Sequence, residues 1–257
     1  MYLGNRPPAN ALSSSGIWTP PQVAERKYAN QWPSDADPHW SSVVMLLQPN
    51  ATDTAITDKS SVASAITING TVPLSGVSPW QGGASIALVS AGSNWLFVGP
   101  VGNSSLIFSS GQAFTIEDVV MMNGSRSGYG LQIDTGFWSG SGTGGSVAYW
   151  MGTNNTKLRT DINSGSPANI TGTDDFPPFT FVHRAVTHDG TTVRLFLNGR
   201  LQASSAASGS YAANLATDYR WKLQSTDLMH VAAHRVTRGV CRYNAAFTPP
   251  TGPFPTR

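Results

Sequence analysis

Two adjacent carboxylates in the stretch FTIEDVVMM are the first residues that could carry catalytic chemistry. Most glycosidases place two carboxylates about 5–10 Å apart across the scissile bond, and residues separated by one position on a strand share a face at nearly that spacing. Glu117 and Asp118 are consecutive, so on a strand they point to opposite faces. The other glutamate of the chain, Glu25, is far away in sequence. We therefore predict no catalytic residues and a non-enzymatic protein, with a glycan-degrading enzyme as the least favoured alternative.

Histidine and cysteine spacing argues against a metal centre. His230 and His234 are four residues apart, which on a strand places them on one face about 13 Å apart, too far for one ion. Cys241 is the single cysteine, so neither an internal disulfide nor a thiolate cluster can form. The glycine-rich run GSGTGG at 140–145 lacks the lysine and the helix of a phosphate loop. We expect no metal and no cofactor.

Composition limits the partners and the compartment. Charged residues make up 12% of the 257 residues, the net charge is +2, and no basic run exceeds Arg26-Lys27. This pattern is unlike a nucleic-acid footprint, and no apolar run approaches the roughly 20 residues of a membrane-spanning helix. Residues 1–20 are polar and interrupted by prolines, unlike a secretory signal. We expect a protein made in the cytoplasm that binds no nucleic acid and does not insert into membranes.

From residue 40 onward, the chain reads as many short strands separated by polar turns. Examples are SVVMLLQ, AITINGTVPL, AFTIEDVVMM and MHVAAHRVTRG. THDGTT has Asp-Gly at its centre between alternating residues, which is a strong hairpin signal. After it, Val193, Leu195 and Leu197 alternate with Arg194, Phe196 and Asn198, the pattern of a half-buried strand. We predict an all-β fold, a two-sheet antiparallel sandwich over residues 40–257.

Residues 1–39 have a different character and are predicted to form an extended arm. Pro20 and Pro21 can begin a short helix over QVAERKYANQW, which Pro33 ends. Such a short helix is marginal alone, so its apolar side chains should bury against a partner surface, the alternative being that they fold back on their own domain. The docking or oligomerisation residues that we assign to this arm are Ile17, Trp18, Val23, Tyr28 and Trp32.

The order of these landmarks resembles a known family. The stretches GGASIALVSAGSNWLFV, GQAFTIEDVV, FVHRAVTHDGTTVRLFLNGRLQAS and HRVTRGVCRYNAAFTPPTGPFP are similar to the concanavalin A-like, laminin-G-like jelly-roll module of tailed-bacteriophage virion proteins, especially fibre and tail proteins. The similarity covers about residues 40–254, and SSGIWTPPQVAERKYANQWP resembles the linker that borders such modules. The resemblance implies a jelly-roll sandwich exposed on the virion, after synthesis in the host cytoplasm.

The chain departs from this family pattern at two places. Asp118-Val119-Val120 stands where relatives often carry an aromatic residue, and Ala232-Ala233 stands where an acidic pair is common. These differences weaken any calcium site implied by the resemblance.

The C-terminal segment is predicted to form a structural strap. The chain should turn at Gly239 and lay Tyr243 and Phe247 over the edge of the sandwich, while its prolines keep an extended path. Arg242 is the third strap residue.

Sugar binding needs an aromatic platform beside amide or carboxylate groups. The stretch DTGFWSGSGTGGSVAYWMGTNN contains such residues, and Trp138 with Asn154 is our candidate ligand-binding pair. Tyr149 and Trp150 point to opposite faces if they lie on a strand.

Two functions follow from these observations. The first is a fibre or appendage component that docks through residues 1–39 and displays a sandwich that binds a host cell-surface glycan or receptor. The second is a capsid or neck decoration protein with a purely architectural role. In both cases the partners are other virion proteins, and analogy with phage appendages implies a homotrimer.

Overall fold

In the computed structural model, the described residues form antiparallel β-strands joined by turns. The described residues are 36–88, 94–99, 108, 111–123, 132–134, 147–150, 157–162, 168–206, 221–224 and 228–256. All the described strands lie within His39–Phe254. Among the described residues, helical structure is limited to one 3-10 turn, η1 (Trp40–Ser42). The prediction of an all-β antiparallel fold is confirmed, whereas the helix predicted at 22–32 lies outside the described residues.

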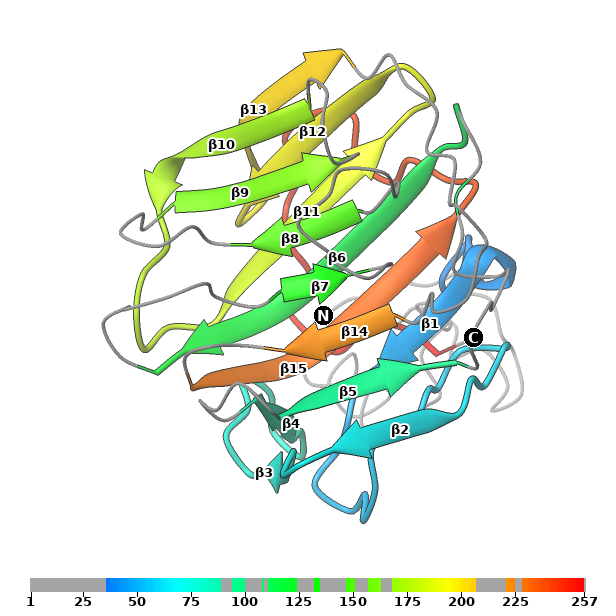
Figure 1. Ribbon diagram of the computed structural model, residues 1–257, viewed down its shortest axis with the longest axis vertical. Coiled ribbons are helices and arrows are strands. Elements are labelled where there is room, and N and C mark those ends of the chain that lie inside the picture. The colour runs from blue at the N-terminus through cyan, green and yellow to red at the C-terminus, as the bar shows by residue number, and fades with distance from the viewer. Residues whose placement is uncertain are drawn as a thin grey trace, which may run out of the picture. The chain divides into compact units, whose positions relative to one another are not determined.

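The described strands form two antiparallel sheets that lie one over the other (Figure 1). The eight-stranded sheet has the order β13-β12-β11-β6-β15-β4-β3, and β1 also pairs with β15. Its strands are β1 (Val43–Leu47), β3 (Leu74–Ser75), β4 (Ser85–Leu88), β6 (Phe114–Met122), β11 (Val182–His188), β12 (Thr192–Leu197), β13 (Arg200–Ala206) and β15 (Met229–Arg238).

The seven-stranded sheet has the order β10-β9-β8-β7-β14-β5-β2. Its strands are β2 (Ile66–Asn69), β5 (Trp95–Val98), β7 (Gln132–Asp134), β8 (Val147–Trp150), β9 (Lys157–Ile162), β10 (Ala168–Asp175) and β14 (Trp221–Gln224). Side chains from both sheets form the main core: Ile116, Val120 and Val186 come from the eight-stranded sheet, and Leu96 and Leu223 come from the other. This shared core makes the two sheets a sandwich.

The centre of the eight-stranded sheet is buried on both faces. Its central strands β6 and β15 are buried along almost their whole length. A second apolar cluster on the outer face contains Val119, Ala232 and Ala233, and Phe254 from the C-terminal segment packs against it. We call residues 239–254 the C-terminal strap. The strap therefore adds a third layer to the sandwich at this sheet.

Several local predictions can be compared with the strands. The hairpin at Asp189-Gly190 is confirmed, since β11 and β12 pair antiparallel on either side of it. Phe196, expected on the exposed side of a half-buried strand, is instead fully buried, because Phe247 of the strap packs against its ring at 5.4 Å between centroids. The sequence reading did not anticipate β3, β10 and β14, which are short or polar.

Candidate functional site

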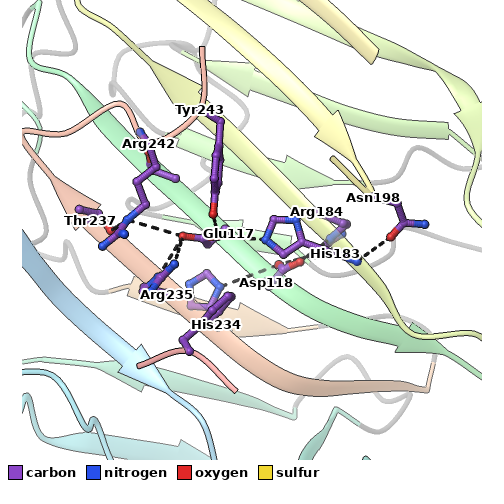
Figure 2. Close-up of polar contacts among 12 residues, drawn as sticks. Glu117, Asp118, His183, Arg184, Asn198, His234, Arg235, Thr237, Arg242 and Tyr243 are labelled. Atoms are coloured by element: carbon purple, nitrogen blue, oxygen red, sulfur yellow. Dashed lines mark hydrogen bonds and ion pairs between the residues drawn. The ribbon is translucent and has the colours of Figure 1, made fainter. Parts of the chain in front are cut away.

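Glu117 on β6 is the centre of a charged cluster beneath the strap (Figure 2). Its Oε1 accepts hydrogen bonds from Nε and a terminal nitrogen of Arg235, at 2.9 and 2.7 Å. Its Oε2 accepts from Nε2 of His183 and from the Tyr243 hydroxyl, both at 2.9 Å. Nε of Arg242 lies 3.7 Å from Oε1. The carboxylate is completely buried, so these donors replace water.

Strand register explains why these groups meet. Glu117 lies opposite Ala185 of β11 and Arg235 of β15, so it sits between two neighbouring strands on the outer face. The guanidinium of Arg235 also lies 4.0 Å from the ring centroid of Phe254 in the strap, a cation–π contact. The strap thus supplies both an aromatic cover and the hydroxyl of Tyr243 to a charge carried by the middle of the sheet.

The electrostatics of this cluster favour the ionised carboxylate. Burial by itself raises the pKa of Glu117, but the charge of Arg235 and the hydrogen bond from His183 outweigh it and lower the pKa from 4.5 to about 2. Burial, followed by the negative charge of Glu117, raises the pKa of Tyr243. Glu117 is therefore an anion and Tyr243 a neutral hydrogen-bond donor at neutral pH.

Asp118 belongs to a separate ion pair on the opposite face of β6. Its Oδ1 accepts from Nε of Arg184 at 2.7 Å, and Nδ1 of His234 lies 3.9 Å from its Oδ2 (Figure 2). Burial raises the pKa of Asp118, but the charge of Arg184 outweighs this effect and the net shift is downward. All three side chains are fully buried. Because Ile116 and Val120 share this face and belong to the main core, the pair lies between the two sheets.

This arrangement determines what the two carboxylates can do chemically. They face opposite sides of one sheet, as the sequence suggested, and neither is exposed to solvent. A glycosidase acid must keep a proton at working pH and reach the sugar. Glu117 and Asp118 instead hold negative charge in closed ion pairs, so their contacts connect strands and strap.

The histidines are positioned differently from the prediction. His230 and His234 were expected on one face, but a β-bulge between Val231 and Ala233 reverses the alternation. Nδ1 of His230 is hydrogen-bonded to Oγ of Ser85 at 3.0 Å, whereas Nδ1 of His234 lies 3.9 Å from Oδ2 of the buried Asp118. Within the described residues, no group of three or more His, Cys, Asp or Glu side chains could hold a metal ion.

The strap residues lie over a face of the eight-stranded sheet rather than over the sandwich edge. Tyr243 and Phe247 stack with ring centroids 3.6 Å apart, and the Tyr243 carbonyl accepts from the Thr187 hydroxyl at 2.8 Å. Nε of Arg242 donates to the Thr237 hydroxyl at 2.7 Å. The difference arises because the outer face of β6, β11 and β15 carries polar groups that need partners, and the strap provides them.

The predicted ligand-binding and docking residues lie outside the described part of the chain. This applies to Trp138 and Asn154, and to the arm residues Ile17, Trp18, Val23, Tyr28 and Trp32. Their roles remain predictions. The structure also gives no helix, among the residues it describes, of the length and apolarity needed to cross a membrane.

Phe179 is an exposed aromatic residue that sequence reasoning missed. It lies between β10 and β11, its side chain is 64% exposed, and its φ is +56°, a left-handed conformation that is costly for a bulky residue. Its backbone N–H donates to the Met122 carbonyl at 2.7 Å, which holds the turn against the end of β6. The signal in the sequence is the stretch FPPFT, an aromatic residue following two prolines within a turn. Strained exposed residues of this kind cluster at binding sites.

Comparison with solved structures shows the same fold in receptor-binding proteins. The binding domain of botulinum neurotoxin serotype D superposes with a TM-score of 0.61 at 11% identity, over 80% of this chain and 49% of that one. A structure of botulinum neurotoxin type C, whose cell entry is described as dependent on interaction with two ganglioside molecules, has a TM-score of 0.59 at 15% identity, over 77% of this chain and 48% of that one. The binding domain of botulinum neurotoxin DC in complex with rat synaptotagmin II has a TM-score of 0.58 at 14% identity, over 77% of this chain and 48% of that one. The chain spans about half the length of these structures.

No curated protein sequence matches the chain significantly. The family described as the concanavalin A-like lectin/glucanases superfamily (Laminin_G_3) matches residues 91–223, which is slightly more than half of the sequence. This segment contains Glu117, Asp118 and Phe179, and it runs from before β5 to β14. The two antiparallel sheets agree with this sequence match, and the chain belongs to the Laminin_G_3 family of the concanavalin A-like lectin/glucanase superfamily.

Proposed function

We propose that this protein is a non-enzymatic bacteriophage virion protein, a fibre or appendage component whose sandwich binds a host cell-surface glycan or receptor. The observation that carries the binding role is the membership of a lectin-like family, together with a fold shared with receptor-binding domains. Those domains belong to proteins described with gangliosides and with synaptotagmin. The phage context is supported by the resemblance of the C-terminal stretch to virion modules.

The non-enzymatic part of the proposal rests on the buried carboxylates. Glu117 and Asp118 are the acidic pair nearest to a glycosidase arrangement in the sequence, and both are enclosed in ion pairs. Neither side chain is available to a sugar at the surface. Binding energy must then come from aromatic and amide groups exposed elsewhere on the sandwich.

Phe179 is the described residue that best fits a ligand contact. An aromatic ring presents an apolar face to a pyranose ring or to an apolar receptor side chain, and this ring is 64% exposed on a turn fixed by a backbone hydrogen bond. A fixed aromatic loses little conformational freedom on binding, which favours affinity. Trp138 and Asn154 remain the second proposed contact.

A binding assay with the purified protein tests the proposal. The probes are an array of bacterial surface polysaccharides and ganglioside oligosaccharides, with Phe179→Gly compared against Leu201→Ser. Leu201 is 45% exposed on β13 and serves as an apolar surface control. We expect Phe179→Gly to reduce glycan binding by about tenfold, as expected for an aromatic contact worth about 1.4 kcal/mol, and Leu201→Ser to leave it unchanged. Equal binding by both variants, or release of sugar from the probes, would contradict the proposal.

The assembly part of the proposal concerns residues 1–39. We propose that this arm docks the protein to other virion proteins and supports a homotrimer, so that the protein is localised on the virion. Removal of residues 1–35 should abolish incorporation into particles while the sandwich stays folded. Binding of the intact protein to empty shells, without any effect on adsorption to host cells, would instead indicate the decoration role.

A further inference from the structure

At most lateral edges of the described sheets, contacts within the chain or a very short edge strand hinder the addition of another strand. At one side, β13 and β10 are linked: the Gln202 amide donates to Asp174 at 2.9 Å, and the backbone N–H of Asp174 donates back at 2.8 Å. At the other side, Leu46 of β1 donates its backbone N–H to Asp58 at 2.9 Å and accepts from the N–H of Lys59 at 2.7 Å. β3 is only two residues long. These devices prevent further strand pairing.

The edge strand β2 has a different environment. It ends the order of the seven-stranded sheet and pairs with β5, with Ile66 opposite Val98 and Ile68 opposite Leu96. The hydrogen bond from Gly99 N–H to the Ala65 carbonyl, at 2.8 Å, shows that the backbone N–H and C=O groups of Ala65 are directed toward β5. Because hydrogen-bonding direction alternates along an antiparallel strand, the backbone groups of Ile66 and Ile68 point away from β5. These groups form the outer edge of the sheet.

β2 carries no charged side chain, whereas an edge strand is usually charged, and the two side chains on one of its faces are isoleucines. Ile66 packs against the main core, and Ile68 shares its face but is 45% exposed. Val62 and Val77, at either side of β2 in sequence, are 42% and 41% exposed. No Asp, Glu, Lys, Arg or His occurs between Lys59 and Glu117. Edge strands in soluble proteins normally carry charge or proline to prevent pairing, so β2 has the character of an interface.

We propose that β2 pairs antiparallel with β2 of a second copy of this chain across a two-fold axis at Thr67, a contact that is separate from the homotrimer proposed for residues 1–39. In this register Ile66 of each copy lies opposite Ile68 of the other, and the outward groups of both residues form on the order of four backbone hydrogen bonds. Thr67 then faces its own copy in a non-hydrogen-bonded pair, with Cα atoms about 4.5 Å apart. The seven-stranded sheet continues from one molecule into the next, and the exposed Ile68 side chains become covered.

A second copy fits this edge better than a charged partner. The uncharged stretch offers no group for an acidic or basic ligand, whereas a two-fold contact requires only that the edge complement itself. β2 meets this requirement, since Ile66 and Ile68 flank Thr67 symmetrically on one face. Two sandwiches held in a fixed orientation would contact a glycan-coated surface together and gain avidity, a consequence that rests on the proposed binding function.

Disulfide trapping of the full-length chain tests the register. The variant is Thr67→Cys with Cys241→Ser, which removes the native thiol. A Cα separation of about 4.5 Å is within the range that a disulfide spans, so mild oxidation should link most of the protein into covalent pairs on a non-reducing gel. Leu201→Cys with Cys241→Ser is the matched control, because Leu201 lies on the edge strand β13 of the other sheet and should remain unlinked. Failure of Thr67→Cys to form pairs above the control level would overturn the proposal.

Sedimentation velocity tests the pairing without a new thiol. Ile68→Lys places like charges across the two-fold axis, and we expect the dissociation constant for pairing to rise by about tenfold or more. Leu201→Lys changes an equally exposed apolar residue, 45% in both cases, on the other edge and should have no effect. An unchanged mass distribution for Ile68→Lys would refute the interface. Neither measurement includes a glycan, so a failure of the proposed binding function would not alter these outcomes.

Discussion

Replacing Glu117 by Gln should destabilise the protein strongly. Arg235 is 3% exposed and would lose its carboxylate partner inside the protein. Breaking a buried ion pair by removing one member costs about 3–5 kcal/mol. The pKa of Glu117 leads to a similar value, since a decrease from 4.5 to about 2 corresponds to about 3 kcal/mol. Gln can turn its side-chain oxygen toward Arg235, but its NH2 group then faces His183 and Tyr243. Both of these residues donate hydrogen bonds to Glu117 in the native protein, so donor would face donor.

Urea unfolding followed by tryptophan fluorescence measures this loss, with Asp189→Asn as the matched acid-to-amide control. Asp189 pairs with Arg194 at 2.6 Å near the surface, and its other oxygen caps the turn, which Asn can also do. The control should change the free energy of unfolding by about 1 kcal/mol or less. Adding Arg235→Met to Glu117→Gln should recover part of the stability, because the unpaired charge is then removed. A loss below about 1 kcal/mol for Glu117→Gln would refute the assignment of this cluster as a buried ionic centre.

Three further predictions concern pH, the strap and the exposed aromatic turn. Because the folded-state pKa of Glu117 lies below its unfolded value of 4.5, its contribution to stability is fully present above pH 4.5 and is lost as pH falls toward 2. Urea titrations at decreasing pH should show this loss, and Glu117→Gln should make the free energy of unfolding less dependent on pH. Gly199→Ala should cost about 1–3 kcal/mol more in thermal unfolding than Gly82→Ala. Both glycines have positive φ, but a Cβ added at Gly199 would lie 1.9 Å from the Phe247 carbonyl oxygen, whereas a Cβ at Gly82 would have no atom within 4 Å. Equal losses for the two variants would contradict the strap contact. Phe179→Gly should raise the free energy of unfolding by about 1 kcal/mol by relieving its left-handed backbone, and a decrease would show that the turn is not strained.

The sequence predicted the features that depend on local patterns. The hairpin at Asp189-Gly190 and the strand around Ile116 follow from turn chemistry and from a run of strand-forming residues, which neighbouring residues determine. The complete burial of that strand was not predicted. The β-bulge near Ala233 has no such signature, and it moves His234 to the interior face. A single inserted position reverses every side chain beyond it, so alternation counted from the sequence gives the wrong face.

The ionic cluster could not be predicted for a different reason. Its members come from β6, β11, β15 and the strap, and they are brought together by sheet order rather than by spacing. Sequence separation between Glu117 and Arg235 carries no information about this pairing. Phe179 was missed because an aromatic residue in a proline-rich turn is equally compatible with burial, and exposure is decided by the β10–β11 connection.

The adjacent carboxylates of β6 have a consequence for how this strand is aligned. Glu117 is neutralised by Arg235 on the outer face and Asp118 by Arg184 on the inner face. If β6 slipped by one residue against β11 and β15, each carboxylate would move to the opposite face. One carboxylate would then lie beside the other's arginine, but the second carboxylate and the remaining arginine would be left unpaired in the interior. Ion pairs of this kind add little net stability compared with well-packed apolar residues, but a slip of one residue leaves one carboxylate and one arginine buried without a partner. We infer that the pairs select one register for the central strand. A fixed central strand in turn allows the turns at its ends, including that of Phe179, to differ in sequence without altering the sandwich that presents them.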